Sequence, residues 1–106
     1  MEVSGFTSRL PLYLHDEGYR ALQNAIAENP KVGTAISETH GVRKLRWADA
    51  RRGKGKRGGL RVIYFHDELR SHVWMLAIYD KDEASDLSAA ARRAIGKFVL
   101  GLSRRN

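Results

Sequence analysis

The chain has 106 residues, a formal net charge of +7, no cysteine and a 42% share of hydrophobic residues. This length and composition predict a single globular domain over residues 1–106, and they exclude a disordered chain, a disulfide framework and a zinc site built on thiolates. Glutamate at position 2 and the lack of a long apolar run argue against a signal peptide and a membrane-spanning helix, so we expect a protein of the reducing cytoplasm.

The N-terminal part is expected to be mostly helical. Residues 3–7 form a candidate short strand, and a longer helix is predicted from Asp16, a candidate N-cap, to residues 29–30. The apolar residues of this helix recur at spacings of three and four: Tyr19, Leu22 and Ile26. A short helical turn is predicted over residues 32–36, and Thr39-His40-Gly41 is expected to end the helical part of the chain.

The C-terminal part is expected to form three strands followed by a helix. Alternation predicts a half-buried strand over residues 42–48, and four glycines in the segment 51–59 predict a mobile connection to the next strand. Residues 60–65 and 72–79 are rich in β-branched and aromatic side chains, which predicts an antiparallel hairpin. Ser88 is a candidate cap for a final helix with a core-facing stripe of Ile95, Phe98, Val99 and Leu102. Together these elements predict an α+β fold.

The positive charge is concentrated in one segment. Nine of the nineteen Lys and Arg residues lie between Gly41 and Arg61, and Asp49 is the single acid among them. A focused positive field attracts polyanions, of which nucleic acids are the commonest. The alternative is a solvated loop that keeps the protein soluble, but solubility does not require the charge to be clustered.

Several common catalytic sites are not matched by this chain. Gly53 and Gly58 have the spacing of a phosphate-binding loop, but Gly59 and Leu60 follow where that motif has Lys and Ser or Thr. No serine stands in a G-x-S-x-G context, and the four histidines lack the close spacing of a metal site. Four acids near the end of the last strand are interpreted as turn and helix N-terminal residues in preference to ligands of a two-metal nuclease: Asp80, Asp82, Glu83 and Asp86. We therefore predict neither a metal nor a cofactor.

Metal-free RNA cleavage fits the residues that remain. In this reaction the ribose 2′-OH attacks the adjacent 3′ phosphate, and Lys and Arg side chains stabilise the charge that develops on the phosphorane. The predicted catalytic residues are Lys44 and Arg46 on one strand face, Arg61 at the start of the next strand, and Tyr79 and Lys81 where the last strand ends. Tyr79 is our candidate for proton transfer. The other basic residues of the segment are predicted to bind RNA: Arg43, Arg51, Arg52, Lys54, Lys56 and Arg57.

Other conspicuous side chains receive structural interpretations. Arg61 shares a strand face with Ile63, and a bulge near Gly58-Gly59 is a possible means of aiming Arg61 at the site. Tyr64 and Trp74 are interpreted as core residues in preference to base-stacking platforms. The basic residues on or beyond the last helix are interpreted as solvated side chains that suit its C-terminal dipole, in preference to RNA contacts: Arg92, Arg93, Lys97, Arg104 and Arg105.

Three segments carry a resemblance to a known family. They read V-R-K-L-R-W, K-G-K-R-G-G-L-R-V-I-Y-F and W-M-L-A-I-Y-D-K-D-E-A-S-D-L, in this order and spacing. The chain resembles the RelE/HigB superfamily of toxins from type II toxin-antitoxin systems, and most closely its HigB-type branch, over roughly residues 16–97. The resemblance implies a compact RelE-like single domain with N-terminal helices, a small, mainly antiparallel sheet and a C-terminal helix.

The resemblance also implies an activity and partners. Such toxins are ribosome-dependent endoribonucleases that enter the A site, cut mRNA without a metal and are held inactive by a cognate antitoxin protein. By position, Lys44 and Arg46 match the basic strand residues of the family site, Arg61 matches its strand arginine, and Lys81 matches a basic residue after the last strand. The RelE branch has a tyrosine near the start of its last helix, whereas this chain has Ser88 or a neighbour there and no tyrosine after Tyr79.

Two other functions remain open at the level of sequence. ParE-like relatives share the fold but poison DNA gyrase, and they do not depend on a phosphate-cleaving basic site. A non-catalytic RNA- or ribosome-binding module would need only the clustered charge, and its mark would be salt-dependent binding without a cleavage product.

Overall fold

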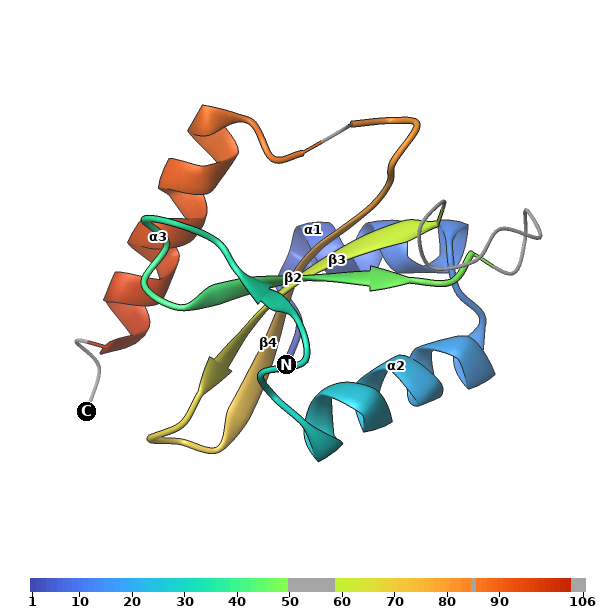
Figure 1. Ribbon diagram of the computed structural model, residues 1–106, viewed down its shortest axis with the longest axis horizontal. Helices are drawn as coiled ribbons and strands as arrows, with labels where there is room; N and C mark the ends of the chain where they lie inside the picture. Colours follow the sequence, from blue (N-terminus) through green and yellow to red (C-terminus); the bar gives the residue numbers. More distant parts are fainter. Residues whose placement is uncertain (50–58, 85, 104–106) are drawn as a thin grey trace.

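A computed structural model describes residues 1–49, 59–84 and 86–103 of the chain. Figure 1 shows N-terminal helices, a twisted sheet and a C-terminal helix, which is the α+β fold that the sequence predicts. The elements in chain order are α1 (Ser4–Arg9), a 3₁₀ turn (Leu10–Leu12), α2 (Asp16–Glu28), β1 (Thr34–Ala35), β2 (Val42–Trp47), β3 (Leu60–Asp67), β4 (His72–Asp80) and α3 (Ala89–Ser103). No helix within these described ranges is long and apolar enough to cross a membrane.

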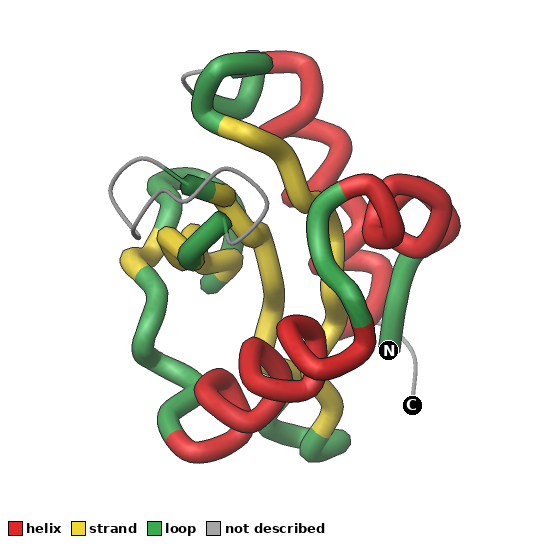
Figure 2. The backbone as a smooth tube through the Cα atoms, turned by 90° about the vertical axis from the view of Figure 1, so that its right-hand side faces the viewer, coloured by secondary structure: helices red, strands yellow, loops and turns green. Residues whose placement is uncertain are grey.

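The described strands form one antiparallel sheet in the order β1-β2-β3-β4, and helices cover both of its faces. One core cluster joins α1 and α2 to the sheet through buried Phe6, Leu22 and Ile26. A second cluster joins α3 to the opposite face through Val99, which packs with Ile63 of β3. Figure 2 shows this arrangement from the side, with the strands between the helices. Because β3 is buried on both faces, its apolar run has no simple alternation.

The predicted hairpin and final helix are confirmed. β3 pairs with β4 in antiparallel register, and Ser88 Oγ accepts a hydrogen bond from the Ala91 backbone N–H at 3.0 Å, as an N-cap does. Tyr64 is fully buried in the core, and the Trp74 ring packs edge-on against Phe98 at 5.3 Å between centroids. Both aromatic residues are therefore core residues, as the sequence indicates. The predicted stripe of α3 packs against the sheet.

Two predicted elements and one predicted helix cap in the N-terminal part are wrong. Residues 4–9 form helix α1 instead of a strand, because only the first three residues pair with the edge of β4 and the chain then turns to bury Phe6. The predicted helical turn over residues 32–36 is strand β1, in which Thr34 pairs with Lys44 of β2. At residues 34–35 a sheet edge offers unpaired backbone groups, and pairing with them outweighs a weak local preference. At residues 4–9 the burial of Phe6 in a helix outweighs it. The N-cap of α2 is also His15, with Asp16 as the first helical residue.

A buried hydroxyl holds β1 against the sheet. Tyr64 Oη donates to the Pro30 carbonyl at 2.8 Å and accepts from the Gly33 backbone N–H at 2.9 Å. At Gly33 the chain passes so close to the sheet that a Cβ atom would lie 2.9 Å from the Lys44 carbonyl oxygen. Residue 33 therefore has no room for a side chain, and this contact fixes the edge of the sheet beside Lys44.

The N-terminal segment is tied to α2 by one carboxylate. Thr7 Oγ1 and Tyr19 Oη each donate to Glu2 at 2.6 Å. These two hydrogen bonds lower the pKa of Glu2 below its usual value. The folded protein therefore holds Glu2 ionised more firmly than the unfolded chain does.

Candidate nucleic-acid interface

Three of the predicted catalytic residues lie side by side across the sheet. Arg46 of β2 is the register partner of Arg61 of β3, and Arg61 is the partner of Tyr79 of β4. Directly opposed residues project from the same face of a sheet, and Lys44, two positions before Arg46, projects from that face too. This is the face covered by α3, because Tyr79 belongs to the core cluster of that helix. We call Arg46, Arg61 and Tyr79 the cross-strand row.

The position of Arg61 comes from ordinary strand pairing. β2 and β3 pair without interruption from Val42–Phe65 to Trp47–Leu60, and Arg61 is paired with both neighbouring strands. The irregularity in the described part of the sheet lies between Ile63 and Tyr64, where β3 meets β4, and not beside Arg61. The bulge suggested near Gly58-Gly59 is not needed to aim this side chain, since alternation along β3 already places it on the α3 face.

Arg61 is a buried cation, with only 9% of its surface exposed. Its guanidinium makes one long hydrogen bond, 3.4 Å, to the carbonyl of its neighbour Leu60, and no acid of the described ranges forms an ion pair with it. Directly opposite stands Arg46, whose side chain is exposed. Like charges opposed across a strand pair destabilise a sheet, and a buried charge without an acid costs further free energy. This arrangement is costly for folding and favourable for binding an anion.

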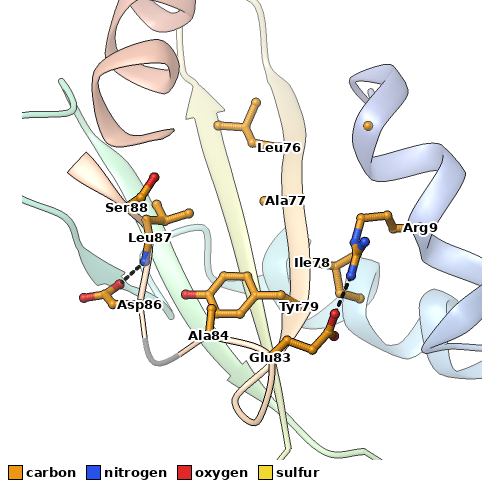
Figure 3. Close-up of a pocket in the computed structure, with 11 residues that line it drawn as sticks. Arg9, Leu76, Ala77, Ile78, Tyr79, Glu83, Ala84, Asp86, Leu87 and Ser88 are labelled. Carbon is orange, nitrogen blue, oxygen red and sulfur yellow. Dashed lines mark hydrogen bonds and ion pairs between the residues drawn. The ribbon is translucent and has the colours of Figure 1, made fainter. Parts of the chain in front are cut away.

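Tyr79 ends the row with a buried phenol. It is 9% exposed, and its hydroxyl is buried without a hydrogen-bond partner in the part of the chain that the structure describes. Burial raises the pKa of Tyr79, the carboxylate of Asp86 raises it further, and Arg61 opposes them. The phenol is therefore protonated at neutral pH and can act only as a proton donor. Figure 3 shows its oxygen directed toward the side of Asp86.

A pocket of about 510 Å³ lies beside Tyr79, between α1, β4 and the connection to α3. Figure 3 shows Arg9 on the α1 side of this pocket. The Arg9 guanidinium forms an ion pair with Glu83, with 2.7 Å between Nη2 and Oε2. Tyr13 also donates a hydrogen bond to Glu83, which lowers the pKa of that carboxyl. The lining residues are Gly5, Arg9, Leu76, Ala77, Ile78, Tyr79, Glu83, Ala84, Asp86, Leu87 and Ser88.

The acids after β4 hold backbone groups of the connection to α3. Each of three carboxylates accepts a hydrogen bond from a backbone N–H. The Asp82 N–H donates to Asp80 Oδ1 at 2.8 Å, and the Asp80 N–H donates to Glu83 Oε1 at 3.1 Å. The Leu87 N–H donates to Asp86 Oδ1 at 2.8 Å. These contacts are those of turn residues, as the sequence interpretation has it. Within the described residues, no group of three or more His, Asp or Glu side chains is placed to hold a metal ion.

Two residues that the sequence analysis did not place in the site lie next to Lys44. Lys44 Nζ is 3.5 Å from Asp86 Oδ1, and Arg92 of α3 lines the same small pocket as both of them. The backbone N–H of Leu87 is the main cause of a lowered pKa at Asp86, and Lys44 and Arg92 add to it. The sequence favours a solvated Arg92 that suits the C-terminal dipole of the last helix. It is instead the fourth residue of α3, at the end where the helix dipole disfavours a cation.

The remaining predicted residues are not all brought to this face. Arg43 lies on the opposite face of β2, where its guanidinium donates to the Gly33 carbonyl at 2.7 Å and to the Lys31 carbonyl at 3.4 Å. Lys81 follows β4 with an exposed side chain, and its backbone N–H donates to the Gly59 carbonyl at 3.4 Å. The other predicted RNA-binding residues lie outside the described ranges: Arg51, Arg52, Lys54, Lys56 and Arg57.

A comparison with models of known protein families finds no match for this chain.

Proposed function

We propose that the protein is the toxin of a type II toxin-antitoxin system and a ribosome-dependent mRNA endoribonuclease that acts in the cytoplasm. Its partners would be the ribosomal A site with its mRNA, and a cognate antitoxin. The observation that supports this proposal best is the cross-strand row. In it a buried arginine, which forms no ion pair with an acid of the described ranges, lies between an exposed arginine and a buried, protonated phenol. The motif resemblance of the chain points to the same reaction.

The row supplies the groups that metal-free cleavage needs. The 2′ oxygen forms a bond to phosphorus while the bond to the 5′ oxygen breaks, leaving a 2′,3′-cyclic phosphate and a 5′ hydroxyl. Arg61 and Arg46 would stabilise the negative charge of the phosphorane, which is worth roughly 10²–10³ in rate for a positioned donor by analogy with oxyanion holes. Lys44, on the same face, would hold the RNA backbone next to the scissile phosphate. The proton of the 2′ hydroxyl would pass to solvent or a nearby base.

Tyr79 would protonate the departing 5′ oxygen. A phenol with a raised pKa keeps its proton at neutral pH, and Arg61 beside it would stabilise the phenolate that donation leaves behind. Because the hydroxyl is buried in the free protein, the proposal requires that substrate binding expose it. In this proposal Tyr79 takes the role of the tyrosine that the RelE branch carries near its last helix.

The proposal is tested by inducing the wild type and Arg61→Met in cells that lack the antitoxin. New 5′ ends on mRNA are mapped with and without translating ribosomes. Arg20→Met is the matched control, because it removes the same charge from the exposed side of α2, on the other side of the sheet. The proposal requires cuts in the wild type and in the control that need ribosomes and disappear in Arg61→Met.

Other outcomes would overturn it. Growth arrest with DNA damage signalling and without cuts would support a gyrase poison of the ParE kind. Salt-dependent RNA binding without any cleavage product would support a binding module. Cuts that persist in a folded Arg61→Met protein would remove the row from the mechanism.

A further inference from the structure

We propose that the small pocket between β1, β2 and the start of α3 is a second phosphate subsite, in which Lys44 and Arg92 contact the RNA backbone and Asp86 holds the place of the phosphate until RNA displaces it. The inference rests on the proposed function for its ligand, single-stranded RNA. It extends the interface beyond the cross-strand row and assigns a role to a residue that sequence analysis left in solvent.

The pocket is polar and continuous with the face of the row. Its volume is about 190 Å³, and Thr34, Ser37, Lys44, Asp86 and Arg92 contribute its polar side chains. Thr34 is the register partner of Lys44, so both project from the α3 face of the sheet. A neighbouring pocket of about 520 Å³ shares these two residues and reaches Arg46. A polar path therefore runs along the sheet from Arg46 past Lys44 to Arg92.

The charges in the pocket are poorly satisfied. Lys44 and Asp86 are 3.5 Å apart, at the long end of a hydrogen bond, and their side chains are 25% and 48% exposed. Such partly exposed pairs are weak, so an incoming anion can replace the carboxylate at little cost. Nε of Arg92 is buried and has no hydrogen-bond partner among the described residues. A phosphate offers several acceptor oxygens, and it could take up donors of both cations at once.

The Asp86 carboxylate in this pocket favours a phosphate as the ligand. Asp86 is a single carboxylate that lines one pocket with two cations from different elements, lies 3.5 Å from Lys44 Nζ and accepts a hydrogen bond from the Leu87 backbone N–H at 2.8 Å. Arg92 stands at the end of α3 where the dipole disfavours cations, so its presence there is not explained by helix stability. Two cations that share one weakly paired carboxylate form a site that a backbone phosphate can occupy, because it carries the same single negative charge and offers two free oxygens as acceptors.

The test measures binding of a short single-stranded RNA whose 2′-O-methyl groups prevent cleavage. Arg92→Gln is compared with Arg93→Gln, which removes the same charge from the neighbouring exposed position of α3. Loss of one phosphate contact with single-stranded RNA should lower the slope of log affinity against log salt by about 0.7. At 0.1 M salt this corresponds to about a fivefold loss of affinity. Arg92→Gln should show this loss, and Arg93→Gln should show less than half of it.

Asp86→Asn should act in the opposite direction. Removal of the competing carboxylate should tighten RNA binding more than Glu68→Gln does, which makes the same change of charge at the exposed turn between β3 and β4. The gain in RNA affinity from Asp86→Asn should be smaller in the double variant Asp86→Asn/Arg92→Gln, because the phosphate that replaces the carboxylate then meets one cation fewer. Circular dichroism and thermal unfolding check that every variant is folded.

Three results would overturn the subsite. The first is an equal loss of RNA affinity in Arg92→Gln and Arg93→Gln. The second is an equal gain of affinity in Asp86→Asn and Glu68→Gln. The third is a gain from Asp86→Asn that is the same with and without Arg92→Gln. Cleavage on ribosomes separates this failure from failure of the proposed function. If Arg61→Met abolishes cleavage while Arg92→Gln binds and cleaves as the wild type does, the subsite alone is wrong. If the binding results hold and no protein cleaves mRNA, the nuclease proposal alone is wrong.

Discussion

We expect the substitution Arg61→Met to have two effects: it should raise the free energy of unfolding, and it should abolish mRNA cleavage. Arg61 is 9% exposed, and methionine keeps the aliphatic stem of its side chain. The substitution removes a guanidinium that lies opposite Arg46 and makes one hydrogen bond of 3.4 Å within the described residues. Removal of an opposed like charge is worth about 0.2–1 kcal/mol, and the buried charge without an acid adds to this gain. The lost hydrogen bond is long and subtracts less than about 1 kcal/mol.

We therefore expect the free energy of unfolding to rise by about 1 kcal/mol, which raises Tm by roughly 4–8 °C for a domain of this size. The assay is urea denaturation followed by circular dichroism, with a thermal scan on the same samples. Arg20→Met, on the exposed side of α2, should change stability by less than about 0.5 kcal/mol.

A coupling measurement sharpens this prediction. If repulsion across the strand pair is the cause, Arg46→Met should stabilise the wild type more than it stabilises Arg61→Met, by about 0.2–1 kcal/mol. A fall in the unfolding free energy of Arg61→Met by more than 1 kcal/mol would refute the reasoning, since it would mean that the guanidinium has a stabilising partner in the folded protein.

The remaining predictions concern packing and pH. Tyr64→Phe should lower the unfolding free energy by about 1–3 kcal/mol, because it leaves a buried N–H and a buried carbonyl without their partner. Gly33→Ala should cost more than about 1 kcal/mol, because the new Cβ would lie 2.9 Å from a backbone oxygen. Gly5→Ala should stabilise by about 0.5–1 kcal/mol, because the site lies in a helix and has nothing within 4 Å. The lowered pKa of Glu2 contributes stability above about pH 4.5 that is lost as pH falls through the folded value, so Glu2→Gln should flatten the pH dependence there.

Urea denaturation measures the unfolding free energy of these four variants, and Tyr64→Phe and Glu2→Gln each have a matched control. Tyr79→Phe removes a hydroxyl that has no hydrogen-bond partner in the described ranges, so it should change stability by less than about 0.5 kcal/mol. If it costs as much as Tyr64→Phe, the hydroxyl of Tyr79 is bonded in solution. Glu28→Gln, at an exposed position of α2, is the control for the pH series between pH 7 and pH 3. An identical pH profile for Glu2→Gln and the wild type would contradict the role of Glu2.

The sequence by itself determined most of the elements whose signal is local. Side-chain alternation and residue type located β2, β3 and β4, and a repeat of three and four residues located α2 and α3. Ser88 could be identified as a cap because its hydroxyl bonds a backbone group three residues away. Alternation also showed that Lys44 and Arg46 share one strand face, since the period of a strand is set by covalent geometry.

The tertiary structure alone decided the rest, because those features depend on which segments meet. Short segments such as residues 4–9 and 34–35 have weak preferences. Burial of Phe6 favoured a helix in the first, and pairing with β2 made the second a strand. Strand register, which no local pattern specifies across a long connection, aligned Arg46, Arg61 and Tyr79 in one row. The packing of α3 on the sheet brought Arg92 into one pocket with Lys44, two residues far apart in the chain, and gave a side chain expected in solvent a place in the candidate interface.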